Sequence, residues 1–246
     1  MCFSPEADFT SAAVVGFIGV ATLTKVRHKR ELLLAALPLA FACHEFAEGF
    51  VWLGLRGTIP QSGTKIALYA YLAYAWALLP AIVPLAILLV EPRRIRRQLM
   101  VPLCVLGTAV GAYLLWVVVD HPITAHIAGH GIDYRGVGSS GNLVTVLYVV
   151  ATCGSFLLSS SRPIVWFGLA NLAAVAVLVI VQSEGLTSLW CLWAAIISVL
   201  IYLHFLQRRR DDSQPGPRTR DSIEPRFRFR SRDDAPPPEA VEVAEV

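Results

Sequence analysis

The sequence predicts an all-α membrane protein with seven transmembrane helices, its N-terminus outside and its C-terminus in the cytoplasm. Hydrophobic residues make up 55% of the 246 residues, and the mean hydropathy of +0.58 is far above that of a soluble domain. Seven apolar runs follow one another, most of them close to the ~20 residues that a ~30 Å hydrocarbon core requires. Basic residues gather in alternate connections between these runs, which indicates a fixed orientation in the membrane.

The first three runs cover residues 9–26, 32–55 and 66–90. The first follows a short acidic head with Glu6 and Asp8. It has neither the basic start nor the small-residue cleavage site of a signal peptide, so we expect it to remain as a helix. Pro80 and Pro84 should kink the third helix, because a proline lacks the backbone N–H that a helix needs.

The remaining four runs cover residues 99–119, 143–158, 164–182 and 186–206. Gly107 and Gly111 in the fourth have the GxxxG spacing that lets two helices approach closely. From residue 207 onward Pro, Arg, Asp, Ser and Glu dominate, which is typical of a disordered tail. We therefore divide the chain into a seven-helix transmembrane domain, residues 1–206, and a disordered cytoplasmic tail, residues 207–246.

The distribution of basic residues predicts the orientation. With the N-terminus outside, the inner connections and the start of the tail hold twelve Lys or Arg. The outer side holds only Arg56, Lys65 and Arg135. Positive residues concentrate on the cytoplasmic side of membrane proteins. The lipid bilayer is thus the expected partner, and nothing in the charge pattern indicates binding to nucleic acid.

The second run carries three ionisable residues near its middle, His44, Glu45 and Glu48. Each such group costs on the order of 2.5–3.5 kcal/mol to insert at that depth. At ~100° per residue, Glu48 lies about 40° and Glu45 about 100° from His44, so all three share one flank of the helix. We expect this flank to face a buried polar pocket that binds a small polar ligand or a cation. The alternative is that the three residues only hold the helices together.

Polar residues of the later helices are expected to line the same pocket, which would lie between the second, fifth, sixth and seventh helices. Small hydroxyls at helical spacing often form only interhelical hydrogen bonds of ~0.6 kcal/mol each, but several such stripes together favour a polar interior. The predicted ligand-binding residues are His44, Glu45, Glu48, Tyr148, Asn171, Glu184 and Ser188.

The connection at residues 120–142 contains three histidines, His121, His126 and His130. His126 and His130 have the spacing of a metal-binding pair on a helix, but Gly129 and Gly131 argue against a helix here. An irregular loop can still bring imidazoles together around Zn²⁺. The other interpretation is a solvated, flexible loop without a metal.

Four short stretches carry a family resemblance: Met1-Cys2-Phe3-Ser4, Ala36-Leu37-Pro38-Leu39, Glu48-Gly49-Phe50-Val51-Trp52 and Thr187-Ser188-Leu189-Trp190-Cys191. Through them the chain resembles a family of uncharacterised bacterial membrane proteins that open with Met-Cys-Phe-Ser, a domain of unknown function. The resemblance covers residues 1 to about 206. It implies a helical bundle in the bacterial inner membrane and no particular activity. Members of the family have Gln-Gln where this chain has His44-Glu45, which places more weight on Glu48 than on a metal site at His44.

Three functions remain open from the sequence. The leading hypothesis is a polar pocket that binds a small polar ligand or cation, for sensing or transport. The second is a metal-dependent membrane hydrolase that resembles the alkaline ceramidase type, with the outer histidines as zinc ligands and Glu45 or Glu48 as base. The chain departs from that type because the late HxxxH pair is missing from its seventh helix. The third is a structural or assembly protein without a pocket.

Overall fold

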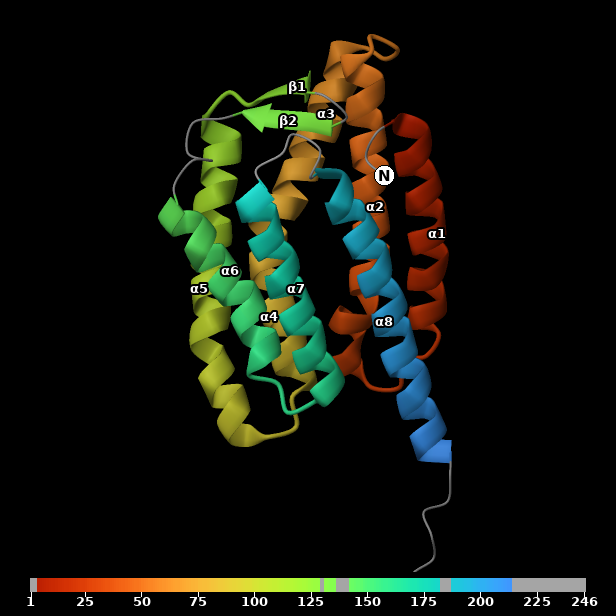
Figure 1. Cartoon of the computed structure of the whole chain (residues 1–246), viewed down its shortest axis with the longest axis vertical. Helices are drawn as coiled ribbons and strands as arrows, with labels where there is room; N and C mark the ends of the chain where they lie inside the picture. Colours follow the sequence, from red (N-terminus) through yellow and green to blue (C-terminus); the bar gives the residue numbers. More distant parts are fainter. Residues whose placement is uncertain (1–3, 129–130, 136–141, 182–186, 214–246) are drawn as a thin grey trace, which may run out of the picture.

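The computed structural model describes residues 4–128, 131–135, 142–181 and 187–213. In these ranges the chain is mostly helical, with seven helices packed side by side and a small β-hairpin at one end of the bundle (Figure 1). The elements are α1 (Pro5–Leu23), the 3₁₀ turn η1 (Lys29–Glu31), α2 (Leu32–Leu55), α3 (Gln61–Leu72), the π-helical segment η2 (Ala73–Leu78), α4 (Leu79–Val90), α5 (Arg94–Asp120), β1 (Thr124–Ala128), β2 (Gly131–Arg135), α6 (Asn142–Leu157), α7 (Arg162–Val181) and α8 (Thr187–Ser213). Because α3, η2 and α4 follow without a break, they form one long helix.

Each of the seven predicted segments contains a helix in its described part, and four of these helices are long and apolar enough to cross a membrane. These four are Pro5–Leu23, Lys29–Leu55, Gln61–Val90 and Arg94–Asp120. The three later helices are apolar over shorter described stretches, Leu143–Leu157, Arg162–Val177 and Trp193–Gln207. The last described helix, α8, continues to Ser213, seven residues past the predicted end of the seventh run at residue 206. The rest of the predicted tail lies outside the described residues.

The first helix begins earlier than the apolar run predicts. Ser4 caps α1, since its hydroxyl oxygen accepts a hydrogen bond from the backbone N–H of Ala7 at 3.3 Å. Pro5 then occupies the first turn, where its fixed φ favours a helix and its missing N–H has no consequence. The supposed acidic head is therefore part of the helix, and Asp8 becomes a buried residue.

The third predicted helix is not regular where its prolines occur. It contains a π-helical segment, Ala73–Leu78, which ends two residues before Pro80. In π-helical register the carbonyl of Ala75 would accept from residue 80, which has no N–H. The hydroxyl of Tyr148 on α6 donates to that carbonyl instead, at 2.8 Å. The helix is therefore completed by a side chain that comes from a distant part of the sequence.

The GxxxG pair of α5 packs against the same disturbed region. A Cβ atom on Gly107 would collide with the carbonyl oxygen of Pro80, and one on Gly111 with that of Ala77. Only glycine allows the two helix backbones to come this close. The predicted close approach is confirmed.

The connection at residues 120–142 was expected to be an irregular loop, but its described part forms an antiparallel hairpin of β1 and β2. Ile123 and Ile132 anchor it, because both are buried in a cluster with Trp52 of α2 and Leu72 of α3. The hairpin consequently lies across one end of the bundle, beside α3 and α5 (Figure 1).

The opposite end of the bundle is held by Glu91, which lies between α4 and α5 and is almost fully buried. Its carboxylate accepts hydrogen bonds from the Ser160 hydroxyl at 2.5 Å, the Ser160 N–H at 2.8 Å, the Arg93 N–H at 3.1 Å and the Ser159 hydroxyl at 3.3 Å. Arg96 adds two bonds, to the carbonyls of Leu158 at 2.9 Å and Ser159 at 2.7 Å. Burial alone would raise the pKa of Glu91, but these hydrogen bonds outweigh it and hold the pKa below its ordinary value.

Candidate functional site

A buried acidic cluster forms where α1 packs against α2. It consists of Asp8 and Ser11 on α1 and of Glu45 and Glu48 on α2, and the three acidic side chains are at most 1% exposed. At 1.5 Å per residue, Glu48 lies about 10 Å and Glu45 about 15 Å along α2 from its end at Leu55. The cluster thus extends from the hairpin end of the bundle towards its middle.

Close packing of α1 on α2 makes this burial possible. Gly19 lies against the backbone of Leu39, where an added Cβ would stand 2.6 Å from the Leu39 nitrogen. With the helices this close, Ser11 faces Glu45, and Asp8 interacts electrostatically with both Glu45 and Glu48. Both helices therefore direct acidic side chains into one small space.

Two tyrosine hydroxyls are directed at Glu48. Tyr134 of β2 donates to Glu48 Oε1 at 3.3 Å, and Tyr71 of α3 is hydrogen-bonded to both Glu48 and Tyr134. Burial, followed by the nearby Tyr71 and Glu48, raises the pKa of Tyr134 well above its ordinary value. Its hydroxyl therefore keeps its proton at neutral pH and acts as a donor to the Glu48 carboxyl.

The rings beside these hydroxyls form a stack that ends at His44. The Tyr71 ring lies 4.9 Å from that of Tyr134 and 4.0 Å from that of His44, and both pairs are nearly parallel. On its other side His44 lines a cavity of about 190 Å³ together with Tyr74 and Tyr148. Neither His44 Nδ1 nor the Tyr74 hydroxyl has a hydrogen-bond partner among the described residues.

The carboxyl groups of Asp8 and Glu45 likewise lack partners in the described part of the chain. Both oxygens of each group, and the Ser11 hydroxyl, are buried without a hydrogen bond of proper geometry, although Ser11 lies near Glu45. A buried carboxylate without a partner is strongly destabilised, and neighbouring carboxylates repel each other. The charge of such a group must be compensated by a proton or by a bound cation.

The comparisons with known proteins place the chain in a family. The family model "Family of unknown function (DUF6629)" matches residues 1–217. The chain belongs to this family. The match includes every described helix and hence the whole acidic cluster, and it confirms the resemblance to a domain of unknown function. A search of the curated proteins and a search of the solved structures found no match.

In this DUF6629 protein the later helices contribute less to the site than predicted. The described contacts of Glu45 and Glu48 come from α1, α3 and β2 instead. Tyr148 lines the cavity beside His44, and its hydroxyl donates to the carbonyl of Ala75. The amide of Asn171 is also in use, since its oxygen accepts from Trp193 Nε1 at 2.9 Å and its nitrogen contacts Cys153 Sγ at 3.4 Å.

Two further predicted residues are not placed at the site. Glu184 and the side chain of Ser188 lie outside the described residues. Two hydroxyls of the stripes that motivated a polar interior bond within their own helices: Thr152 donates to the Tyr148 carbonyl and Ser198 to the Ala194 carbonyl. Back-bonding of this kind satisfies a hydroxyl without creating a pocket.

The predicted histidine site of the DUF6629 chain is only partly described. His126 is exposed on β1 opposite Asp133, and His121 Nδ1 lies 3.8 Å from Asp120 Oδ2. His130 lies outside the described residues. Within the described ranges no group of three or more His, Cys, Asp or Glu is arranged to hold a metal ion.

Sequence reasoning missed the partners of the acidic cluster, namely Asp8, Ser11, Tyr71 and Tyr134. A signal existed for the first two, because Ser4-Pro5 is a typical helix start and places both residues in the first two turns. Their spacing of three then puts them on one helix face. No local signal connects Tyr134 with Glu48, because that contact depends on how the hairpin packs.

Proposed function

We propose that this DUF6629 protein is a seven-span protein of the bacterial inner membrane whose acidic cluster binds a small monovalent cation from the outer side, for transport or sensing. One observation carries the proposal. The carboxyl oxygens of Asp8 and Glu45 are buried without hydrogen-bond partners among the described residues. In a membrane helix an ionisable residue in this state marks a functional site by default.

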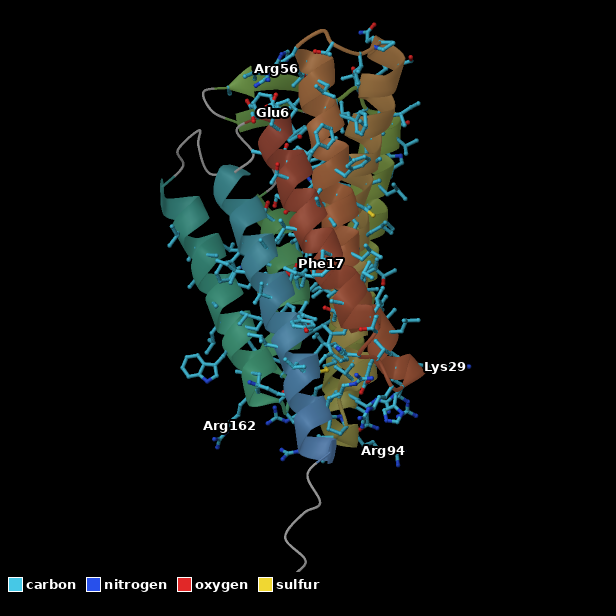
Figure 2. The ribbon with its side chains drawn as sticks, turned by 90° about the vertical axis from the view of Figure 1, so that its right-hand side faces the viewer. Glu6, Phe17, Lys29, Arg56, Arg94 and Arg162 are labelled. Atoms are coloured by element: carbon cyan, nitrogen blue, oxygen red, sulfur yellow. The ribbon has the colours of Figure 1, made fainter. Side chains whose placement is uncertain are left out.

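Placement in a membrane is supported by the four helices that are long and apolar enough to cross it. The orientation is supported by the distribution of charge. Figure 2 shows Lys29, Arg94 and Arg162 at one end of the bundle and Glu6 and Arg56 at the other. By the positive-inside rule, the end with the basic residues faces the cytoplasm. The acidic cluster and the hairpin then belong to the outer half.

A small cation fits the chemistry of the cluster better than a large ligand does. Carboxylate and hydroxyl oxygens are good ligands for hard cations. The stacked rings of Tyr71 and Tyr134 beside them present π faces that also attract a cation such as ammonium. The described residues offer no group of three or more His, Cys, Asp or Glu arranged to hold a metal ion, so ammonium, which binds through hydrogen bonds and π faces, is a candidate beside Na⁺ and K⁺.

Fluorescence titration tests the proposal. Trp52 lies one helical turn beyond Glu48 and is buried, so its emission should report occupancy of the cluster. Purified protein is titrated with Na⁺, K⁺ and NH₄⁺, with N-methylglucamine as a bulky balancing cation. We expect a saturable change with at least one of them, abolished by Glu45→Gln and preserved by Glu6→Gln. Glu6 is the matched control, because it is an exposed acid at the start of α1. Equal responses of wild type and Glu45→Gln would contradict the proposal.

A second candidate ligand is a small neutral polar molecule in the cavity beside His44. It is favoured by His44 Nδ1 and Tyr74 Oη, which have no hydrogen-bond partner in the described part of the chain and belong to residues that line a space of about 190 Å³. His44→Phe separates the two ideas, since it keeps a ring to stack on Tyr71 but removes the nitrogen. Loss of binding of neutral solutes with the cation response intact would favour the cavity. A cation response that survives His44→Phe but not Glu45→Gln, with no binding of neutral solutes by wild type, would favour the acidic cluster.

A further inference from the structure

An apolar groove lies far from the acidic cluster, between α7 and α8 towards the basic end of the bundle. Its volume is about 530 Å³, which is within the range of sites for ligands of drug size. Figure 1 shows α7 and α8 next to each other on one face of the bundle. The floor comes from buried residues of α2 and α4, and the walls come from α7 and α8: Leu34, Leu37, Ile87, Phe167, Ala170 and Ile201.

Polar side chains occur in the groove only at one end. Of the residues that line it, His204 and Gln207 are the polar ones, and both belong to the last turns of α8. Arg162 begins α7 next to the lining residue Pro163, and it is exposed at the same end of the bundle (Figure 2). The groove is thus a hydrocarbon slot with hydrogen-bond donors and a positive charge at its mouth.

We propose that this groove binds one acyl chain of an anionic phospholipid from the inner leaflet, with the headgroup held by Arg162, His204 and Gln207. The inference rests on the membrane placement of the proposed function, but not on its cation site. An empty apolar space loses the dispersion contacts of its lining, and lipid chains are the abundant apolar molecules in a bilayer. The basic mouth selects a negatively charged headgroup, since each Lys or Arg near an anionic lipid surface strengthens binding.

Native mass spectrometry tests the acyl-chain part. The full-length protein is extracted from vesicles of equal parts phosphatidylglycerol and phosphatidylcholine, and the lipid that remains bound is counted. Ala170→Trp should fill the groove and remove the retained lipid. Leu169→Trp places the same side chain on the neighbouring residue, whose side chain is 43% exposed, and should retain it. An unchanged melting temperature confirms that each variant folds.

The headgroup part is tested with Arg162→Gln. Wild type should retain more phosphatidylglycerol than phosphatidylcholine, and the substitution should reduce this preference about fivefold, the effect of one basic residue near an anionic surface. Arg94→Gln is the matched control, because Arg94 is exposed at the same end but does not line the groove. Its lipid preference should equal that of wild type.

Two results would overturn the inference. Retention of lipid by Ala170→Trp at the wild-type level would show that the groove is not the site. Equal retention of the two lipids by wild type would remove the role of the basic mouth. Neither result depends on the cation titration of the acidic cluster. That titration is carried out separately, on Ala170→Trp as well as on wild type. A failed titration with selective lipid retention would reject the cation site and leave the lipid site standing.

Discussion

Removal of the Glu91 carboxylate should destabilise the protein at its basic end. Four donors converge on this nearly buried group, from Ser159, from Arg93 and twice from Ser160. A hydrogen bond to a charged group contributes about 1.5–3 kcal/mol. Because water can reach some donors after truncation, we expect Glu91→Ala to lose about 2–4 kcal/mol in total. For a chain of this length that lowers the melting temperature by roughly 5–10 °C.

Glu91→Gln tests the charge separately from the shape. The amide keeps one acceptor oxygen but presents an NH₂ group to donors, so it should lose most of the stabilisation that the carboxylate supplies. The melting temperature is measured in detergent with a thiol-reactive dye, because the buried Cys153 becomes accessible on unfolding. Gln98, exposed on α5, provides the control substitution Gln98→Ala, which should leave the melting temperature unchanged.

The pH dependence of this effect follows from the lowered pKa of Glu91. A carboxyl whose pKa is lower in the folded than in the unfolded chain stabilises the fold above its ordinary value of 4.5. That contribution disappears as the pH falls through the folded value. The difference in melting temperature between wild type and Glu91→Gln should therefore be constant near neutral pH and shrink below about 4.5. A difference that stays the same down to pH 3, or no difference at neutral pH, would refute the reasoning.

Three further substitutions test other contacts, each by melting temperature in the same assay. Gly107→Ala should lose about 1–3 kcal/mol, because its methyl group would overlap a backbone carbonyl of α4, whereas Gly63→Ala, with its nearest neighbour at 3.7 Å, should not destabilise the protein. Tyr148→Phe should lose about 1–3 kcal/mol by leaving the Ala75 carbonyl unpaired, and an unchanged melting temperature would show that water replaces the hydroxyl. Tyr134→Phe should lose about 1–2 kcal/mol, and the loss should vanish in a Glu48→Leu background, which has no acceptor, if the hydrogen bond is its cause.

Much of the fold could be predicted from the sequence, because long apolar helices leave a strong local signal. The second predicted helix has the observed bounds of α2, and the GxxxG pair of α5 does make a close helix contact. The hairpin was missed because its strands are only five residues each, and such short runs are hard to tell from a loop. Its stability comes from burial of Ile132 against α2 and α3, which no local pattern reveals.

The candidate site was predicted only in part. His44, Glu45 and Glu48 are buried as their cost of insertion demands. The sequence predicts neighbours from the fifth, sixth and seventh helices, whereas the described contacts come from α1, α3 and β2, because an angle on a helical wheel does not say which helix stands opposite. The predicted first helix begins at residue 9, after the acidic head, so the prediction leaves Asp8 of α1 out of the site. The start of a helix, read from its cap rather than from its apolar run, would have corrected this point.

The disturbed helix shows how a local defect is repaired by distant residues. Pro80 and Pro84 remove two N–H groups from one helix, so the carbonyls of Ala75 and Pro80 lose the partners that a regular helix supplies. Tyr148 of α6 donates to the first, and Gly107 of α5 allows the second to lie against a bare backbone. The same π-helical segment carries Tyr74, which lines the cavity beside His44. Because backbone groups that are buried without a partner are costly, the prolines favour this packing of α5 and α6 and thereby shape the cavity that adjoins the acidic cluster.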